Sequence, residues 1–221
     1  ELPLFETTGT RKGHRLPPDL AELVSLADTA PLGLYGPYQR VNAKAALAAW
    51  LLICRREGWK TDEKRIRKGL AEAFIPGRLH YVDGAHNVHG MKALRSALLP
   101  GGICEKGLAP SAVIFSCLED KEPDELVPVL ASTLEEIAPG VPVYIPAIAD
   151  NPRAAQPETL ARIAGSESRP LSSLREAVEL ARDSTRHGPV LVCGSLYLLA
   201  EFFTLFPHAL YARGIVPGAQ T

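Results

Sequence analysis

The sequence lacks a strong excess of either charge, because its 24 Lys and Arg residues are balanced by 25 Asp and Glu residues. Without a basic excess the chain has little to hold a nucleic-acid backbone or an anionic membrane surface, so we expect neither partner. No apolar run reaches the length of a membrane span, and the first residues have neither the basic nor the apolar region of an export signal.

Cysteine is scarce and widely spaced. The four cysteines are Cys54, Cys104, Cys117 and Cys193. They form no C-x-x-C pair, so neither a zinc site nor a disulfide framework is indicated. We therefore expect reduced thiols and a cytoplasmic location.

A phosphate loop is missing as well. The pattern G-x-x-x-x-G-K-[ST] holds nucleotide phosphates and magnesium, but the stretches 9–13 and 101–107 have neither its order nor a Ser or Thr after Lys. What the chain does contain is typical of a globular protein. Its 221 residues are 46% hydrophobic and 22% charged, which is enough chain for one large domain or two small ones.

The first third of the chain predicts helices after an irregular start. Residues 1–30 mix glycine, proline and charge with short apolar runs, a pattern that suits a strand or two and turns. The Ala- and Leu-rich segment 39–57 predicts a helix, since basic residues fill its last turn and Gly58 follows. Thr61 is expected to cap a second helix that ends before Pro76.

Beyond that proline, strand and helix patterns alternate, so we separate residues 1–75 from residues 76–221. Short apolar runs predict strands at 80–84, 111–117, 141–147 and 189–195. Helical spacing follows each run, and two helices follow the third one. The fold class is therefore α/β: a Rossmann-like domain with a mostly parallel sheet, helices on both faces, and ligands at the carboxyl ends of the strands.

Three polar motifs lie where predicted strands end. They are DGAHN at 83–87, CLEDKE at 117–122 and CGS at 193–195. Because parallel strands finish on a common edge, all three could line one rim. A glycine after Asp83 lets the backbone approach a ligand, so this corner could hold phosphate or ribose.

Each motif also has a structural explanation. Asp83 and Asn87 can be only turn and cap residues, with His86 packed beside them. Lys121 lies in a charge run of the kind that is usually solvated. Ser195 has no G-x-S-x-G around it, so it is a poor nucleophile candidate; it can cap the last helix or donate a hydrogen bond to a ligand carboxylate.

A metal site is a further alternative. His86 and His89 are three residues apart and could share a helical face, and Asp83 would complete a D-x-x-H-x-x-H cluster. The chain offers no H-E-x-x-H motif to support it.

Four segments in order carry a family resemblance. They are 36–49, 76–87, 115–122 and 190–198. Together they resemble the folylpolyglutamate synthase/dihydrofolate synthase branch of the Mur ligases, over about residues 32–205. The resemblance implies that residues 1–75 are the end of the central ATPase domain and that residues 76–221 are the C-terminal domain, which binds glutamate and closes over the nucleotide.

The resemblance also implies roles for four residues toward ATP. Asn42 would contact adenine, and Arg78 would reach the phosphates, where a guanidinium fork suits them. Asp83 would bind near the ribose. His86 would lie near the reacting phosphates and is the expected catalytic residue.

Two further residues are expected to hold L-glutamate. Lys121 would pair with one of its carboxylates and Ser195 would hydrogen-bond the same molecule. The implied reaction activates a folate or dihydropteroate carboxylate as an acyl phosphate, with ATP and magnesium, and the amine of glutamate then displaces phosphate. We expect a monomer in which Arg78, Asp83, Lys121 and Ser195 converge beside one cleft.

Two departures from the family pattern matter. Tyr38 stands where relatives carry His, and few residues separate Arg78 from Asp83. Since the phosphate loop is also absent, we expect a fragment of the ligase with no activity alone. The alternatives are a stand-alone nucleotide-binding module without catalysis and the metal-dependent enzyme on Asp83, His86 and His89.

Overall fold

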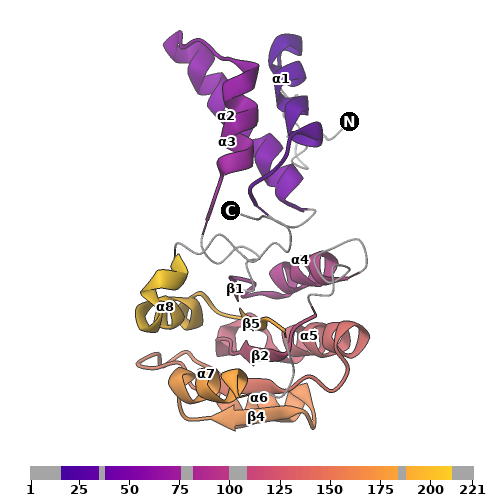
Figure 1. The fold of residues 1–221 in the computed structure, drawn as a ribbon, viewed down its shortest axis with the longest axis vertical. Helices are drawn as coiled ribbons and strands as arrows, with labels where there is room; N and C mark the ends of the chain where they lie inside the picture. Colours follow the sequence, from indigo (N-terminus) through magenta and orange to yellow (C-terminus); the bar gives the residue numbers. More distant parts are fainter. Residues whose placement is uncertain (1–15, 35–37, 76–81, 100–108, 184–187, 211–221) are drawn as a thin grey trace. The chain divides into compact units, whose positions relative to one another are not determined.

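The computed structural model describes residues 16–34, 38–75, 82–99, 109–183 and 188–210, which are coloured in Figure 1. Arg78 lies outside the described residues. The chain divides into two compact units, Glu1–Phe74 and Ile75–Thr221. No helix among the described residues is both long enough and apolar enough to cross a membrane.

The first unit contains three described helices. They are α1 Pro18–Thr29, α2 Tyr38–Glu57 and α3 Glu63–Glu72. Their shared core is formed by Leu20, Val24, Leu47, Ala48, Leu51 and Ile66.

Helix α1 contradicts the expectation of strands and turns before residue 30. Pro18 occupies its first turn, where the missing proline N–H costs nothing. Leu20, Val24 and Ala27 are buried and recur at intervals of four and three residues, so they share one helical face. The glycines and prolines of the preceding residues obscured this spacing.

The two following helices agree with the prediction except at one cap. α2 ends in a left-handed turn at Gly58 (φ 67°), and the Trp59 N–H donates to the Cys54 carbonyl at 2.8 Å. Asp62, and not Thr61, caps α3, because its side chain accepts from the Lys64 N–H at 2.9 Å. The expected Thr61 cap is wrong by one residue.

The second unit is built on a five-stranded sheet. Its strands are β1 Val82–Asp83, β2 Ala112–Phe115, β3 Val143–Pro146, β4 Ser168–Leu171 and β5 Val190–Cys193. They lie in the order β1-β5-β2-β3-β4 and all pairs are parallel. The predicted α/β class is confirmed. β4 was not predicted: its sequence, SRPL, contains a charge and a proline and only one buried residue.

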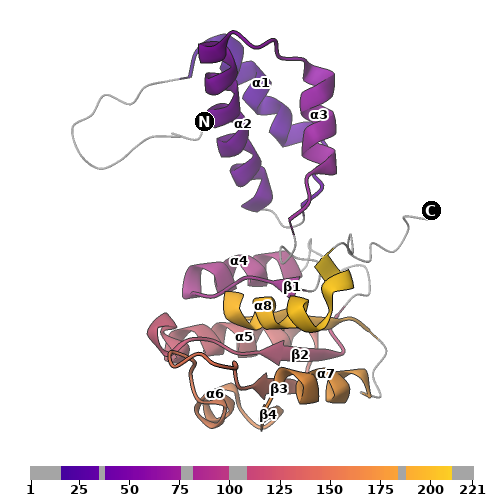
Figure 2. The same cartoon turned by 90° about the vertical axis from the view of Figure 1, so that its left-hand side faces the viewer.

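Helices cover both faces of the sheet. α4 Val88–Leu98, α5 Pro123–Ile137 and α6 Pro157–Ala164 lie on one face, and α7 Leu174–Arg182 and α8 Leu196–Leu205 lie on the other (Figure 2). Right-handed crossovers explain this arrangement. The connection from β4 to β5 runs back across the sheet, whereas the other connections between strands run forward, so its helix α7 lies on the opposite face. Among the described residues, this unit also has two 3-10 turns, Glu119–Lys121 and Pro207–Leu210.

Strand β2 shows how the core forms. All four of its residues are buried, as a strand covered on both faces requires. Ala112 and Ile114 pack with α7 and α8, and alternation turns Val113 and Phe115 to the opposite face. The sheet is thus a rigid frame for the loops at its carboxyl edge.

Candidate functional site

Three neighbouring strands, β1, β5 and β2, end at one level of the sheet (Figure 1). Asp83 pairs with Cys193, and Cys193 pairs with Phe115. The loops that follow carry the three polar motifs, so these motifs leave the sheet side by side at its carboxyl edge.

Asp83 shapes the first loop from a buried position. Its Oδ1 accepts the Ala85 N–H at 2.8 Å, which closes a turn at the end of β1. Burial, and then the negative charge of Asp83, raise the pKa of the Cys193 thiol above its ordinary range. Cys193 therefore stays a neutral thiol and is no nucleophile.

His86 and Asn87 complete this loop. His86 is half-buried, and its Nδ1 lies 2.7 Å from the Gly84 carbonyl oxygen. Because a carbonyl only accepts, Nδ1 carries a proton and Nε2 is the nitrogen left for a ligand. The Asn87 side chain accepts the Gly90 N–H at 2.7 Å and caps α4. Asn87 thus makes the contact that the structural explanation predicts.

The metal hypothesis gains no support. Among the described residues, no three His, Cys, Asp or Glu side chains are grouped so that they could hold a metal ion. His89 is exposed, whereas Asp83 is buried and bonded to its own turn.

The second loop, counted across the sheet from β1, is the one after β5, and it requires a glycine at position 194. Gly194 has φ 105°, and a Cβ there would strike the Ser116 carbonyl oxygen and the Phe115 ring. The loops after β5 and β2 therefore approach each other at backbone distance. Ser195 follows and is buried. Its Oγ accepts the Tyr197 N–H at 3.1 Å, so the predicted cap of the last helix is confirmed.

The third loop carries a cluster of three charges. Lys121 Nζ lies 3.4 Å from Asp120 Oδ2, and Arg153 Nη2 lies 2.6 Å from the same oxygen. The hydrogen bond from Arg153, and then the charges of Arg153 and Lys121, hold the pKa of Asp120 below its ordinary value. Two cations thus share one carboxylate.

Arg153 was not predicted as a site residue. The segment before α6 runs antiparallel to the loop after β2. The Glu119 N–H donates to the Arg153 carbonyl at 2.9 Å, and the Ala155 N–H donates to the Cys117 carbonyl at 3.0 Å. This pairing brings Arg153 to Asp120 across 33 residues of sequence, and no local pattern signals it.

Five of the six expected site residues lie in the part of the chain that the structure describes. Asp83, His86, Lys121 and Ser195 lie in the loops at the carboxyl edge of the sheet. Asn42 belongs to the first unit, on α2, where its side chain is exposed and donates to Gln39 Oε1 at 3.1 Å.

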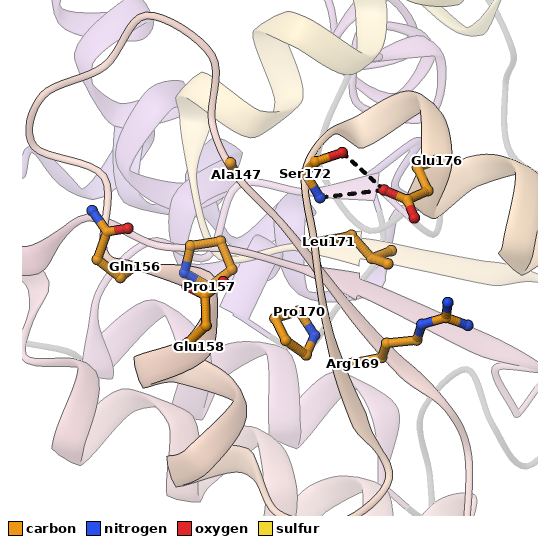
Figure 3. Close-up of a pocket in the computed structure, with 9 residues that line it drawn as sticks. All are labelled: Ala147, Gln156, Pro157, Glu158, Arg169, Pro170, Leu171, Ser172 and Glu176. Carbon is orange, nitrogen blue, oxygen red and sulfur yellow. Dashed lines mark hydrogen bonds between the residues drawn. The ribbon is translucent and has the colours of Figure 1, made fainter.

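A separate cavity of about 410 Å³ opens at the other side of the carboxyl edge (Figure 3). It is lined by Ala147, Gln156, Pro157, Glu158, Arg169, Pro170, Leu171, Ser172 and Glu176. None of these is an expected site residue. The Glu176 carboxylate accepts from Ser172 N at 3.2 Å and Ser172 Oγ at 3.0 Å, so it stabilises the start of α7.

Comparison with known families identifies the domain type that this geometry resembles. Residues 71–196 match the family model described as "Mur ligase, glutamate ligase domain". The dihydrofolate synthase/folylpolyglutamate synthase of Escherichia coli (strain K12) is 33% identical over 171 residues, which cover 72% of this chain and 36% of that protein.

Solved structures of folylpolyglutamate synthases also resemble this chain. The folylpolyglutamate synthase of Mycobacterium tuberculosis complexed with ADP superposes with a TM-score of 0.61 at 25% identity, covering 79% of this chain and 41% of that one. E. coli FolC in complex with DHPP and ADP gives a TM-score of 0.61 at 26% identity, covering 82% and 41%. The chain thus spans well under half the length of these relatives.

Proposed function

Because the chain belongs to the family of Mur ligase glutamate ligase domains, we propose that it is part of an ATP-dependent ligase that joins L-glutamate to folate or dihydropteroate. The observation that carries the proposal is the family match over residues 71–196, in a domain where the cations Lys121 and Arg153 lie at the carboxyl edge of the sheet. The relatives, named dihydrofolate synthase/folylpolyglutamate synthase, support the substrate class.

The proposal divides the chain by task. Residues 1–75 are the end of a central ATPase domain, and residues 76–221 are the domain that binds glutamate and covers the nucleotide. The division of the chain into compact units between Phe74 and Ile75 supports a boundary close to this position. Most magnesium ligands and the pterin site would belong to polypeptide outside this sequence, so the chain alone is proposed to be inactive.

L-Glutamate would bind across the second and third loops. Lys121 supplies a cation for one carboxylate of this dianion, while Arg153 remains paired with Asp120. Since Ser195 Oγ already accepts the Tyr197 N–H, its own hydroxyl proton can be donated to a ligand carboxylate. Neither contact uses the glutamate amine, which must be free to attack.

The first loop would face the nucleotide. His86 presents Nε2, because Nδ1 is held by the Gly84 carbonyl, and this nitrogen is proposed to lie near the reacting phosphates. Asp83 is proposed to lie near the ribose, Asn42 to contact adenine, and Arg78 to reach the phosphates. ADP in the complexes of two relatives supports a nucleotide role.

The proposed chemistry has two steps. A substrate carboxylate oxygen attacks the γ-phosphorus of ATP, the bond to ADP breaks, and an acyl phosphate forms. The glutamate amine then attacks the acyl carbon, the C–O bond to phosphate breaks, and an amide, inorganic phosphate and a proton result. The residues of this chain contribute by positioning the amine and stabilising charge.

The direct test restores the phosphate-loop polypeptide and measures ATP-dependent incorporation of labelled L-glutamate. Lys121→Ala is expected to raise KM for glutamate, and His86→Ala to lower kcat, each by about a hundredfold. Lys92→Ala and His89→Ala are matched controls, since both side chains are exposed on α4. Full activity in both site variants would refute the site assignment.

A stand-alone nucleotide-binding module is the second candidate, since the second unit is compact and has a core of its own. Titration of the isolated chain with ATP separates the two. Tight binding without any further polypeptide supports the module, whereas weak binding supports the ligase part. In either case we propose a monomer in the cytoplasm, where the buried free thiols Cys54, Cys117 and Cys193 stay reduced.

A further inference from the structure

The cavity in Figure 3 lies where two neighbouring connections of the sheet separate. α6 follows β3 on one face of the sheet, and α7 follows the adjacent strand β4 on the other face (Figure 2). When the loops after two adjacent parallel strands turn to opposite faces, they leave a crevice at the carboxyl edge, and α/β proteins bind small ligands in such crevices. The cavity is this crevice, because Ala147 and Gln156 line it from the loop after β3 and Ser172 lines it from the loop after β4.

The candidate site occupies a different crevice of the same kind. The loop after β5 leads to α8 on one face, whereas the loops after its neighbours β1 and β2 lead to α4 and α5 on the other. The lining of the cavity includes none of Asp83, His86, Lys121 and Ser195. Its volume of about 410 Å³ lies within the range of about 300–1,000 Å³ that is typical of small-molecule sites. The fold therefore offers a second place for a small ligand.

Part of the lining is an apolar floor, which consists of Ala147, Pro157, Pro170 and Leu171. Pro157 and Leu171 are buried, and the two proline rings lie in the middle of the view in Figure 3. Each proline ring fixes a backbone angle, so this part of the floor is rigid before a ligand arrives. Such a floor stabilises the hydrocarbon part of a ligand by removing it from water.

Opposite charges stand on the two sides of the apolar floor. Glu158 comes from α6 and Arg169 comes from β4, and both are exposed. Within the part of the chain that the structure describes, neither side chain has a hydrogen-bonding or ionic partner. Glu176 differs, since its carboxylate accepts two hydrogen bonds from Ser172. The cavity thus presents one carboxylate and one guanidinium that are not paired with each other.

This charge pattern selects among ligands. The guanidinium of Arg169 suits a carboxylate, which it can bind through two parallel hydrogen bonds. The lining nevertheless has two carboxylates, Glu158 and Glu176, against that one cation, so a dianion such as L-glutamate or phosphate would be repelled. A ligand that carries an ammonium group beside its carboxylate satisfies both free side chains.

We propose that the cavity between β3 and β4 binds a small zwitterion, an α-amino acid with an apolar side chain. Its ammonium group pairs with Glu158, its carboxylate pairs with Arg169, and its side chain lies on the apolar floor. This inference goes beyond the proposed function and does not rest on it, because no residue proposed to hold L-glutamate or ATP lines the cavity.

The first test titrates the isotope-labelled 221-residue chain with L-leucine and follows its amide NMR signals. Saturable shifts are expected at Ala147, Arg169 and Ser172, with no shift at Lys121 or Ser195. Two analogues test each charge separately. 3-Methylbutylamine lacks the carboxylate and 4-methylpentanoate lacks the ammonium group, and each is expected to bind about tenfold more weakly than L-leucine.

Variants then test the two charged partners. Arg169→Ala and Glu158→Gln are each expected to weaken L-leucine binding about tenfold. Arg175→Ala and Glu179→Gln are the matched controls, since both residues are exposed on α7 and neither lines the cavity. Ala147→Leu is expected to abolish binding by filling the cavity, and circular dichroism checks that this variant is folded. The two charge variants lie at exposed positions, so their result does not depend on it.

Several results would overturn the proposal. They are L-leucine shifts that do not saturate, shifts that fall outside the cavity, analogues that bind as tightly as L-leucine, and charge variants that bind it unchanged. L-Glutamate distinguishes the two proposals. Shifts at Lys121 and Ser195 on adding L-glutamate support the proposed function whatever L-leucine does, whereas L-glutamate binding at Arg169 and Ser172 would refute the selectivity proposed for the cavity.

Discussion

The two units of this chain differ in how completely each buries its apolar residues. The second unit encloses its sheet between two helical layers, and every residue of β2 is buried. The first unit packs one side of α2 and leaves the other exposed. The difference indicates that the second unit has a complete core of its own, whereas the first unit buries only one side of α2.

The largest expected loss of stability lies in the second unit, where the loops after β5 and β2 meet at Gly194. Gly194→Ala is expected to lower its free energy of unfolding by about 4 kcal/mol, since the methyl group meets backbone and the positive φ adds strain. Gly165→Ala, also at positive φ but with open space around it, should cost about 2 kcal/mol. Denaturation followed by far-UV circular dichroism would measure both, and equal costs would contradict the close approach.

A core substitution in the first unit tests whether the units unfold independently. Leu51→Ala is expected to lower the stability of the first unit by about 3 kcal/mol, because the side chain is fully buried. Tryptophan fluorescence reports on this unit alone, since both tryptophans lie in it. A simultaneous shift of the circular dichroism transition of the sheet would show that the two units unfold as one.

The start of α3 gives a smaller effect. Asp62→Ala is expected to cost the first unit about 1 kcal/mol, since the Lys64 N–H loses its acceptor. Thr61→Ala serves as the control and should change the midpoint of the fluorescence transition very little. A larger effect of Thr61→Ala than of Asp62→Ala would indicate that Thr61 is the cap.

The charge cluster of the second unit is expected to give the mildest response. Arg153 lowers the pKa of Asp120, so its stabilising contribution is present above the unfolded pKa of about 3.9 and is lost as pH falls through the folded value. Arg153→Ala should raise the Asp120 pKa toward the ordinary value, as measured by NMR titration. Arg162→Ala, at an exposed position of α6, should leave the Asp120 pKa unchanged.

Local patterns predicted most of the second unit correctly. A helix was predicted after each apolar run, with two after the third, and four of the five strands were located, because apolar runs and helical spacing are local signals. β4 escaped prediction because a short edge strand with one buried residue has no such signal. α1 escaped because its spacing was read together with the glycine-rich residues before it.

Candidate site residues divide in the same way. The motifs containing Asp83, Lys121 and Ser195 were recognised from their place at strand ends. Arg153 was missed, because it reaches Asp120 only through the pairing of two loops that are distant in sequence. The strand order, with β5 between β1 and β2, was equally invisible to local reasoning.

Sequence alone was sufficient for the α/β class, the family and the polar motifs at the strand ends, since each depends on residues close together in the chain. Tertiary structure decided which strands are neighbours, that Arg153 and Lys121 share one carboxylate, and that half of α2 is left uncovered. These features depend on contacts between distant segments, whose free energy is set by packing and not by local propensity.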